Sequence, residues 1–227
     1  MNFPSSNLAG RTVARILLEI EAIHIRPQQP FTLTSGRLSP VYIDCRKIIA
    51  FPRARRKIMD LAVDLIEQKI GFECFDAIAG GETAGIPFAA WIAERFALPM
   101  MYVRKQAKGF GKKAQIEGDI KNGWRCLLVE DLASDGGSKI NFVNALRQAE
   151  AIVKDIFVIF YYDIFPASQQ RLQEMDVKLH HLATWWDVLE YVQAEKLFNH
   201  QDIAAIKNFL TNPEQWTPNN SVTSHKL

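Results

Sequence analysis

Two adjacent carboxylates, Glu130 and Asp131, are followed closely by Gly136, Gly137 and Ser138, and residues of these types could hold a sugar phosphate. Carboxylate oxygens accept hydrogen bonds from sugar hydroxyls. The two glycines let the backbone approach a ligand, and the serine can cap a helix whose free amides favour a phosphate. The same residues also suit an ordinary helix start beside two solvated acids, so the spacing by itself leaves both interpretations open.

The flanking residues predict where these groups lie. Cys126 to Val129 is a short apolar run, typical of a strand buried on both faces of a parallel sheet. We expect this strand to stop at the two acids. Lys139 to Glu150 carries apolar residues at helical spacing. A strand, turn and helix in this order put the turn at the carboxyl ends of the strands, where open α/β folds bind ligands.

Length and composition favour a single globular domain. The chain has 227 residues, of which 48% are hydrophobic, and its net charge of +2 gives no reason to expect nucleic acid as a partner. No apolar stretch is long enough to span a membrane, and the N-terminus lacks the pattern of a signal peptide. Cys45, Cys74 and Cys126 show no metal-ligand spacing, so we expect reduced thiols in a cytoplasmic protein.

The N-terminal part of the chain predicts two helices around a hairpin. Apolar spacing favours a helix over Arg11 to Ile25. The alternating run Phe31 to Leu33, the turn at residues 35–36 and the second run Val41 to Cys45 predict the hairpin. Pro52 to Lys69 has the spacing of a helix with a basic start, which is either a solvated face or a contact with another subunit.

Four further strands and two helices complete the expected sheet. The strands are Ala77 to Ala79, Pro99 to Val103, Asp155 to Tyr161 and Val177 to Ala183, and the helices are Ile86 to Phe96 and Ser168 to Glu174. Between the second of these strands and the central one, residues 104–121 carry six cations against two acids. A loop of this length and charge is either solvated or a lid that closes over a site.

Three segments of the chain resemble type I phosphoribosyltransferases. Arg125 to Ser138 resembles that family's motif for phosphoribosyl pyrophosphate (PRPP): a strand, two acids, a short turn and Gly-Gly-Ser. Phe31 to Asp44 resembles the N-terminal signature of the orotate phosphoribosyltransferases, which forms a hood over the pyrimidine. Residues 104–108, Arg-Lys-x-x-Lys, resemble the family's catalytic loop. The segments occur in the family's order, and the resemblance covers most of residues 31–186.

The resemblance implies an α/β fold with a five-stranded, mainly parallel sheet flanked by helices and an N-terminal hood. Residues 1–70 would form the N-terminal helices and hood, residues 71–210 the phosphoribosyltransferase core, and residues 211–227 a flexible tail. The implied reaction transfers 5-phosphoribosyl from PRPP to orotate, giving orotidine 5′-monophosphate and pyrophosphate. The family also implies Mg²⁺, held mainly by PRPP and water without a direct protein ligand, and a homodimer with shared active sites.

The family's functional positions carry over onto this chain residue by residue. The implied catalytic residues are Arg104, Lys105, Lys108 and Asp131, of which Arg104 and Lys108 would reach into the neighbouring subunit's site. PRPP would be bound by these four together with Glu82, Thr83, Glu130, Leu132, Ala133, Ser134, Asp135, Gly136, Gly137 and Ser138. Orotate would be bound by Tyr42, Ile43 and Ser134.

Several positions depart from the family pattern. Asp135 stands where a threonine is usual in the phosphate loop, which adds a negative charge beside the expected anion. Thr34 and Ala84 take the places of two lysines, and Phe110 takes the place of a histidine. Fewer positive charges are therefore expected around the pyrophosphate.

The arginine that pairs with the orotate carboxylate in many members is missing here, since Asp163 and Ile164 follow the fourth strand. We expect backbone amides of the hood, helped by Arg37 or Arg46, to meet that carboxylate. A phosphoribosyltransferase for a different base is one alternative. A regulatory protein that binds PRPP or nucleotides through a retired active site is another, but a retired site needs neither the acid pair nor the lid cations.

Overall fold

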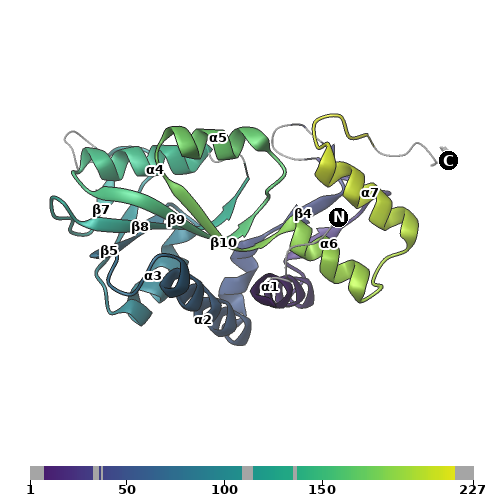
Figure 1. Ribbon diagram of the computed structural model, residues 1–227, viewed down its shortest axis with the longest axis horizontal. Coiled ribbons are helices and arrows are strands. Elements are labelled where there is room, and N and C mark those ends of the chain that lie inside the picture. Colours follow the sequence, from purple (N-terminus) through teal and green to yellow (C-terminus); the bar gives the residue numbers. More distant parts are fainter. Residues whose placement is uncertain (1–7, 33–35, 37, 109–114, 135–136, 218–227) are drawn as a thin grey trace.

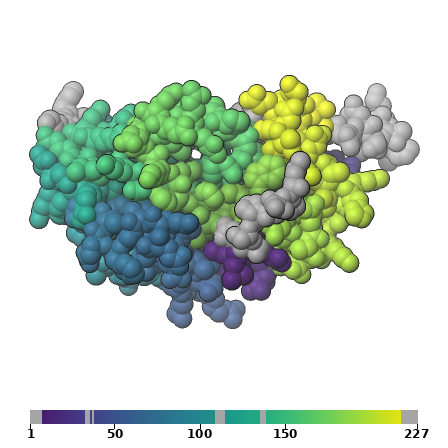
Figure 2. Space-filling model, viewed as in Figure 1, coloured from purple at the N-terminus to yellow at the C-terminus, as the bar shows by residue number. Residues whose placement is uncertain are grey.

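The computed structural model describes residues 8–32, 36, 38–108, 115–134 and 137–217. A central sheet is covered by helices on both faces, and α1, α6, α7 and the short strand β4 lie together at one end of it (Figure 1). The space-filling view shows the blue α2–α3 region, the green α5 region and the yellow C-terminal helices joined in one surface (Figure 2). Residues 218–227 of the expected flexible tail lie outside the described residues.

Within the described residues, six strands form the central sheet in the order β10-β9-β8-β5-β6-β7. Their bounds are β5 Ala77–Gly81, β6 Met100–Val103, β7 Ile116–Glu117, β8 Arg125–Ala133, β9 Ile152–Tyr161 and β10 Lys178–Thr184. The five longer strands are parallel, which confirms the prediction. The two-residue strand β7 adds an antiparallel edge to β6.

The helices enclose the sheet because successive residues of each strand face opposite sides. In β8, Leu127 and Val129 belong to one hydrophobic core, whereas Cys126 and Leu128 belong to the other. The first core lies under α2 (Pro52–Lys69) and α3 (Gly85–Phe96), and the second lies under α4 (Gly137–Gln148) and α5 (Pro166–Glu174). The central strand is thus buried on both faces, as its apolar run predicted.

The N-terminal helix is shorter than predicted. Helix α1 spans Leu8–Glu19, and Glu21 then takes a left-handed conformation with φ of 55°, which turns the chain out of the helix. The next residues form β1 (Ile23–Ile25), which pairs antiparallel with β4 (Val41–Ile43). The prediction of a helix reaching Ile25 is therefore wrong, because these β-branched residues find partners far away in the sequence.

The predicted hairpin is wrong in its pairing. Strand β2 (Phe31–Thr32) pairs with β3 (Leu38–Ser39), and β4 pairs with β1 instead. Pro40 separates β3 from β4, and its carbonyl accepts a hydrogen bond from the N–H of Arg26 at an N–O distance of 2.7 Å. This bond extends the contact between β1 and β4, so two short ladders replace one hairpin.

The central strand is longer than predicted, and Glu130 and Asp131 lie inside β8 rather than after it. Strand β9 continues alongside them: Glu130 lies opposite Val158, and Ala133 lies opposite Tyr161. The hydrogen bonds to β9 hold the backbone of this segment, so the two carboxylates project from a rigid element.

The C-terminal helices complete the core on the side of α2 and α3. Helices α6 (Trp185–Ala194) and α7 (His200–Thr211) bury side chains in the same cluster as α1. Thr184 and Asp187 form a capping box that fixes the start of α6 directly after β10. In the described part of the chain, no helix combines the length and the apolar character needed to cross a membrane.

Candidate active site

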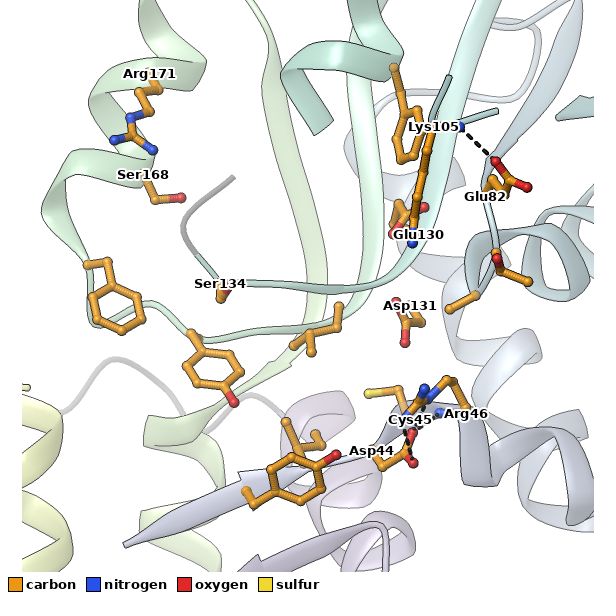
Figure 3. Close-up of a pocket in the computed structure, with 18 of the residues that line it drawn as sticks. Asp44, Cys45, Arg46, Glu82, Lys105, Glu130, Asp131, Ser134, Ser168 and Arg171 are labelled. Atoms are coloured by element: carbon orange, nitrogen blue, oxygen red, sulfur yellow. Dashed lines mark hydrogen bonds and ion pairs between the residues drawn. The ribbon is translucent and has the colours of Figure 1, made fainter. Parts of the chain in front are cut away.

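A cavity of about 1050 Å³ opens beside the carboxyl ends of β5 and β8 (Figure 3). Its walls come from β4 and the 3₁₀ helix η1 (Cys45–Ala50), the loop between β5 and α3, the end of β8, and residues 162–171. Elements far apart in the sequence therefore meet where an open α/β sheet binds ligands.

Glu130 and Asp131 both line this cavity and are nearly buried, with 6% and 9% of their surface exposed. The ammonium nitrogen of Lys139 in α4 lies 3.6 Å from Glu130 Oε2. Burial raises the pKa of Glu130 to about 7, and the positive charge of Lys139 opposes this rise. Burial also raises the pKa of Asp131, again against the charge of Lys139. The acid pair is thus harder to ionise than two exposed carboxyls.

Two glycines make room for the Glu130 side chain. A Cβ on Gly81, at the end of β5, would collide with Glu130 Oε1 and lie 2.7 Å from Phe142 Cε2. A Cβ on Gly85, at the start of α3, would collide with the carbonyl oxygen of Val129 and lie 2.9 Å from Glu130 Oε1. Strands β5 and β8 and helix α3 can approach this closely only because neither residue has a side chain.

We expect Gly81→Ala to destabilise the fold by about 1–3 kcal/mol, the usual range for an added methyl group without room. Activity should fall as well, because Glu130 must move. Chemical denaturation and steady-state kinetics measure the two effects. Glu130→Ala removes the atoms nearest the new methyl group, so Gly81→Ala should destabilise the Glu130→Ala protein less than the unmodified one. Equal losses in both backgrounds would contradict this packing.

The loop between β5 and α3 fixes the start of the cationic segment that begins at Arg104. Glu82 and Thr83 line the cavity, and Glu82 Oε2 accepts a hydrogen bond from the backbone N–H of Lys105 at 2.7 Å (Figure 3). On the other side, the Asn141 amide donates to the carbonyl oxygen of Lys105 at 3.0 Å. The backbone of Lys105 is therefore held between two elements while its side chain reaches the cavity.

The other two expected lid cations lie elsewhere. Arg104 forms an ion pair with Glu117 of β7 at 3.1 Å, and neither Arg104 nor Lys108 lines the cavity of its own chain. Lys108 is exposed. Residues 109–114, which include Phe110, lie outside the described residues.

The hood brings an aromatic side chain to the cavity. Tyr42 and Ile43 both line it, and the Tyr42 ring packs against Phe31 with ring centroids 5.5 Å apart. Arg46 also lines it, held by Asp44 through hydrogen bonds of 2.6 and 2.9 Å. Thr34 and Arg37 lie outside the described residues.

The expected phosphate loop is described only in part. Leu132 and Ser134 line the cavity, whereas Ala133 belongs to the core under α4 and α5. Residues 135–136 lie outside the described residues, and residues 137–138 form the start of α4. The first amides of a helix have no partner within the helix, and this helix starts at the same end of the sheet as the acid pair.

Sequence reasoning missed two cations of this region. Arg171 in α5 lines the cavity, and Lys139 lies buried behind the acid pair. Nothing in the sequence distinguishes Arg171 from a solvated helix residue. Lys139 does carry a signal, because a cation in the first turn of a helix opposes the helix dipole and calls for a local partner.

The described part of the chain shows no metal site built from protein ligands alone. No group of three or more His, Cys, Asp or Glu side chains within it could hold a metal ion.

The buried acid pair lies beside a helix start at the end of a parallel sheet, with the hood and a cationic loop next to it. This combination of features defines a phosphoribosyltransferase. The family model for the phosphoribosyl transferase domain matches residues 46–185. The chain is 55% identical to orotate phosphoribosyltransferase of Cereibacter sphaeroides, over 95% of this chain and 93% of that protein. It is 52% identical to the Roseobacter denitrificans enzyme of the same name, over 94% of this chain and 95% of that protein.

A solved structure agrees with these relatives. Orotate phosphoribosyltransferase from Aeropyrum pernix matches with a TM-score of 0.70 and 31% identity, over 80% of this chain and 98% of that one. The chain belongs to the orotate phosphoribosyltransferase family.

Proposed function

We propose that this protein transfers the 5-phosphoribosyl group of PRPP to N1 of orotate, forming orotidine 5′-monophosphate and pyrophosphate in pyrimidine biosynthesis. The observation that carries the proposal is the buried acid pair in a cavity bordered by Tyr42 and Ile43 of the hood. The near full-length identity with orotate phosphoribosyltransferases supports orotate as the acceptor.

In the proposed reaction, the bond from ribose C1′ to the pyrophosphate oxygen breaks, and the bond from C1′ to N1 of orotate forms. N1 loses its proton in this step, and the departing pyrophosphate takes it up. Positive charge develops on the sugar while negative charge grows on the departing pyrophosphate. Glu130 and Asp131 accept hydrogen bonds from the ribose hydroxyls and stabilise the positive sugar. Lys105 reaches the cavity and stabilises the leaving group. Such charges act most strongly where water is excluded. Because N1 of orotate bonds to C1′ directly, the reaction needs no nucleophilic residue.

The 5′-phosphate of PRPP would bind at residues 134–138. Ser134 lines the cavity, and α4 starts within this segment, at Gly137. Free backbone amides and the positive end of the helix dipole favour an anion at such a position.

Magnesium suits this cavity as a companion of PRPP. Mg²⁺ prefers several waters and substrate phosphates to a complete set of protein ligands. Two of the cavity carboxylates already have partners, since Glu82 accepts the Lys105 N–H and Asp44 holds Arg46. We therefore assign the ion mainly to PRPP and water. When bound, it would neutralise charge on the departing pyrophosphate.

Recognition of the orotate carboxylate is where this chain departs most from the family pattern. Ile164 is buried, and Asp163 brings a negative charge to the position of the usual arginine. We propose that hood amides and Arg46 meet the carboxylate. Arg46 lines the cavity in an orientation fixed by Asp44. Arg171 is a second arginine on the cavity wall.

The test is pyrophosphate release from PRPP and Mg²⁺ with each candidate base. We expect orotate to react and uracil to be a poor acceptor, because uracil would leave the donors for the carboxylate unpaired. Comparable kcat/KM values for the two would favour a phosphoribosyltransferase for a different base. Binding of PRPP without turnover of any base would favour the regulatory alternative.

We also propose a homodimer in which Arg104 and Lys108 serve the partner's site. Neither residue lines the cavity of its own chain, and this supports the arrangement. A cytoplasmic location is proposed as well, because Cys45, Cys74 and Cys126 are free thiols.

A further inference from the structure

The ion pair between Lys139 and Glu130 connects the cavity to the helix behind it. The side chains of Lys139 and Glu130 are only 9% and 8% exposed, and their charged atoms lie 3.6 Å apart. Glu130 lines the cavity, whereas Lys139 does not. Lys139 therefore touches an acid of the site without touching the space that a substrate would occupy.

This placement is unfavourable for Lys139 by itself. An ammonium group in the first turn of a helix opposes the helix dipole. Burying the two ions also carries a desolvation penalty that their attraction often fails to offset, so stability is a weak reason for the pair. A role in setting the charge of Glu130 is a stronger one.

Charged groups of several elements act on the acid pair. Asp131, the neighbour in β8, disfavours the charge on Glu130, whereas Lys139 of α4 and Lys105 of the lid segment favour it. Arg46 of η1 favours the charge on Asp131. On the loop after β5, Glu82 binds the backbone of Lys105.

Lys139 differs from Lys105 in one respect that matters. Lys105 is exposed, so solvent and salt screen its charge. Lys139 is buried and fixed in a helix, so it acts on Glu130 whether the lid is open or closed.

We propose, on the basis of the function proposed above, that Lys139 is a positioning residue: it keeps Glu130 ionised and oriented to accept a hydrogen bond from a ribose hydroxyl. A protonated Glu130 would present a donor at one of its oxygens instead. Oε2 is paired with Lys139, and Oε1 has no hydrogen-bond partner in the described part of the chain. Oε1 is itself buried, close to Gly81 and Gly85.

The direction of the pH effect follows from these charges. Burial raises the pKa of Glu130 to about 7, so its acceptor form is lost as the pH falls through neutrality. Lys139 lowers that pKa, and removing its charge must therefore move the loss to higher pH. The rate at a pH below the transition falls about tenfold for each unit of the shift.

The experiment compares Lys139→Met with the unmodified protein by measuring kcat/KM for PRPP from acidic to alkaline pH. We expect the acidic limb of the Lys139→Met pH profile to move to higher pH by about one pH unit or more. Lys139→Arg should keep the original limb. Lys154→Met, which removes an exposed cation from β9, should leave the profile unchanged. An unmoved limb in a folded Lys139→Met protein would overturn the proposal.

A second comparison assigns the effect to Glu130. In Glu130→Gln, the residue cannot ionise, so adding Lys139→Met should not move the limb further. A shift of equal size in that background would overturn the proposal.

A measurement without turnover separates this inference from the proposed reaction. The titration of the Glu130 carboxyl can be followed by ¹³C NMR in the free protein, with Glu130→Gln to assign the signal. We expect its midpoint to lie at higher pH in Lys139→Met than in the unmodified protein. If Lys139→Met does not fold, Lys139→Gln takes its place. An unchanged midpoint would refute the role of Lys139 even if orotate is turned over. A raised midpoint in a protein that transfers phosphoribosyl to no base would instead refute the proposed function.

Discussion

Asp131→Asn is expected to lower kcat at least tenfold, which corresponds to about 1.4 kcal/mol in the activation barrier. The amide keeps the shape of the carboxylate but loses the negative charge that faces the positive sugar. Steady-state kinetics with PRPP and orotate measure the effect. Unchanged turnover would show that Asp131 has no part in holding the ribose.

Folding stability should change little in this variant, although Asp131 lies inside β8. Its side chain faces the cavity, and burial disfavours its charged form, as the raised pKa indicates. A neutral amide at this position does not have that penalty. Asp155→Asn is a suitable control, because Asp155 is a partly buried carboxylate on the neighbouring strand, bound to His180 away from the cavity. We expect its kcat to remain unchanged.

Mixing two inactive variants should restore about a quarter of the original activity. Lys108→Ala and Asp131→Asn proteins are each expected to be nearly inactive. If Lys108 acts in the partner's site, a mixed dimer has one site with both lesions and one with neither. Equal random exchange makes about half of the dimers mixed, and half of their sites are intact.

The recovery separates the two possible arrangements of the lid. If Lys108 serves its own chain, every site keeps one lesion and no activity returns. Subunit exchange must therefore be demonstrated independently, for example with two affinity tags. Exchange without recovery would exclude a shared site. Lys121→Ala is the matched control for Lys108→Ala, because it removes a cation near the end of the same segment. We expect the Lys121→Ala protein to be active without mixing.

The parallel sheet could be predicted because its signal is local. Apolar runs such as Cys126 to Val129 mark strands buried on both faces, and the intervening residues have helical spacing. The ends of these elements could not be predicted in the same way. Strand β8 continues past Glu130 because β9 lies beside it, and β4 leaves its neighbour in sequence for β1. Both outcomes depend on pairing between distant segments.

Site residues that belong to a motif could be predicted from the sequence. Site residues that only packing brings to the cavity could not. Glu130, Asp131, Ser134, Tyr42 and Lys105 all reach the cavity, as expected from the motifs. Ala133 does not, because its side chain belongs to the core.

Lys139 and Arg171 appear in no motif, since their relation to the site arises from where α4 and α5 pack. The same limit applies to the raised pKa of Glu130, because burial depends on the whole fold.

The alternation of side chains along β8 has a consequence for how this enzyme could be redesigned. Glu130 pairs with Lys139 of α4. Asp131 lies on the side of η1 and Arg46 (Figure 3). The two acids are adjacent in sequence, but their side chains lie on opposite faces of the sheet, near different elements. An engineer who rebuilds the hood to admit another base would therefore perturb Asp131 first and leave Glu130 largely untouched. Base choice and sugar chemistry are therefore coupled through Asp131, whereas Glu130 stays outside that coupling.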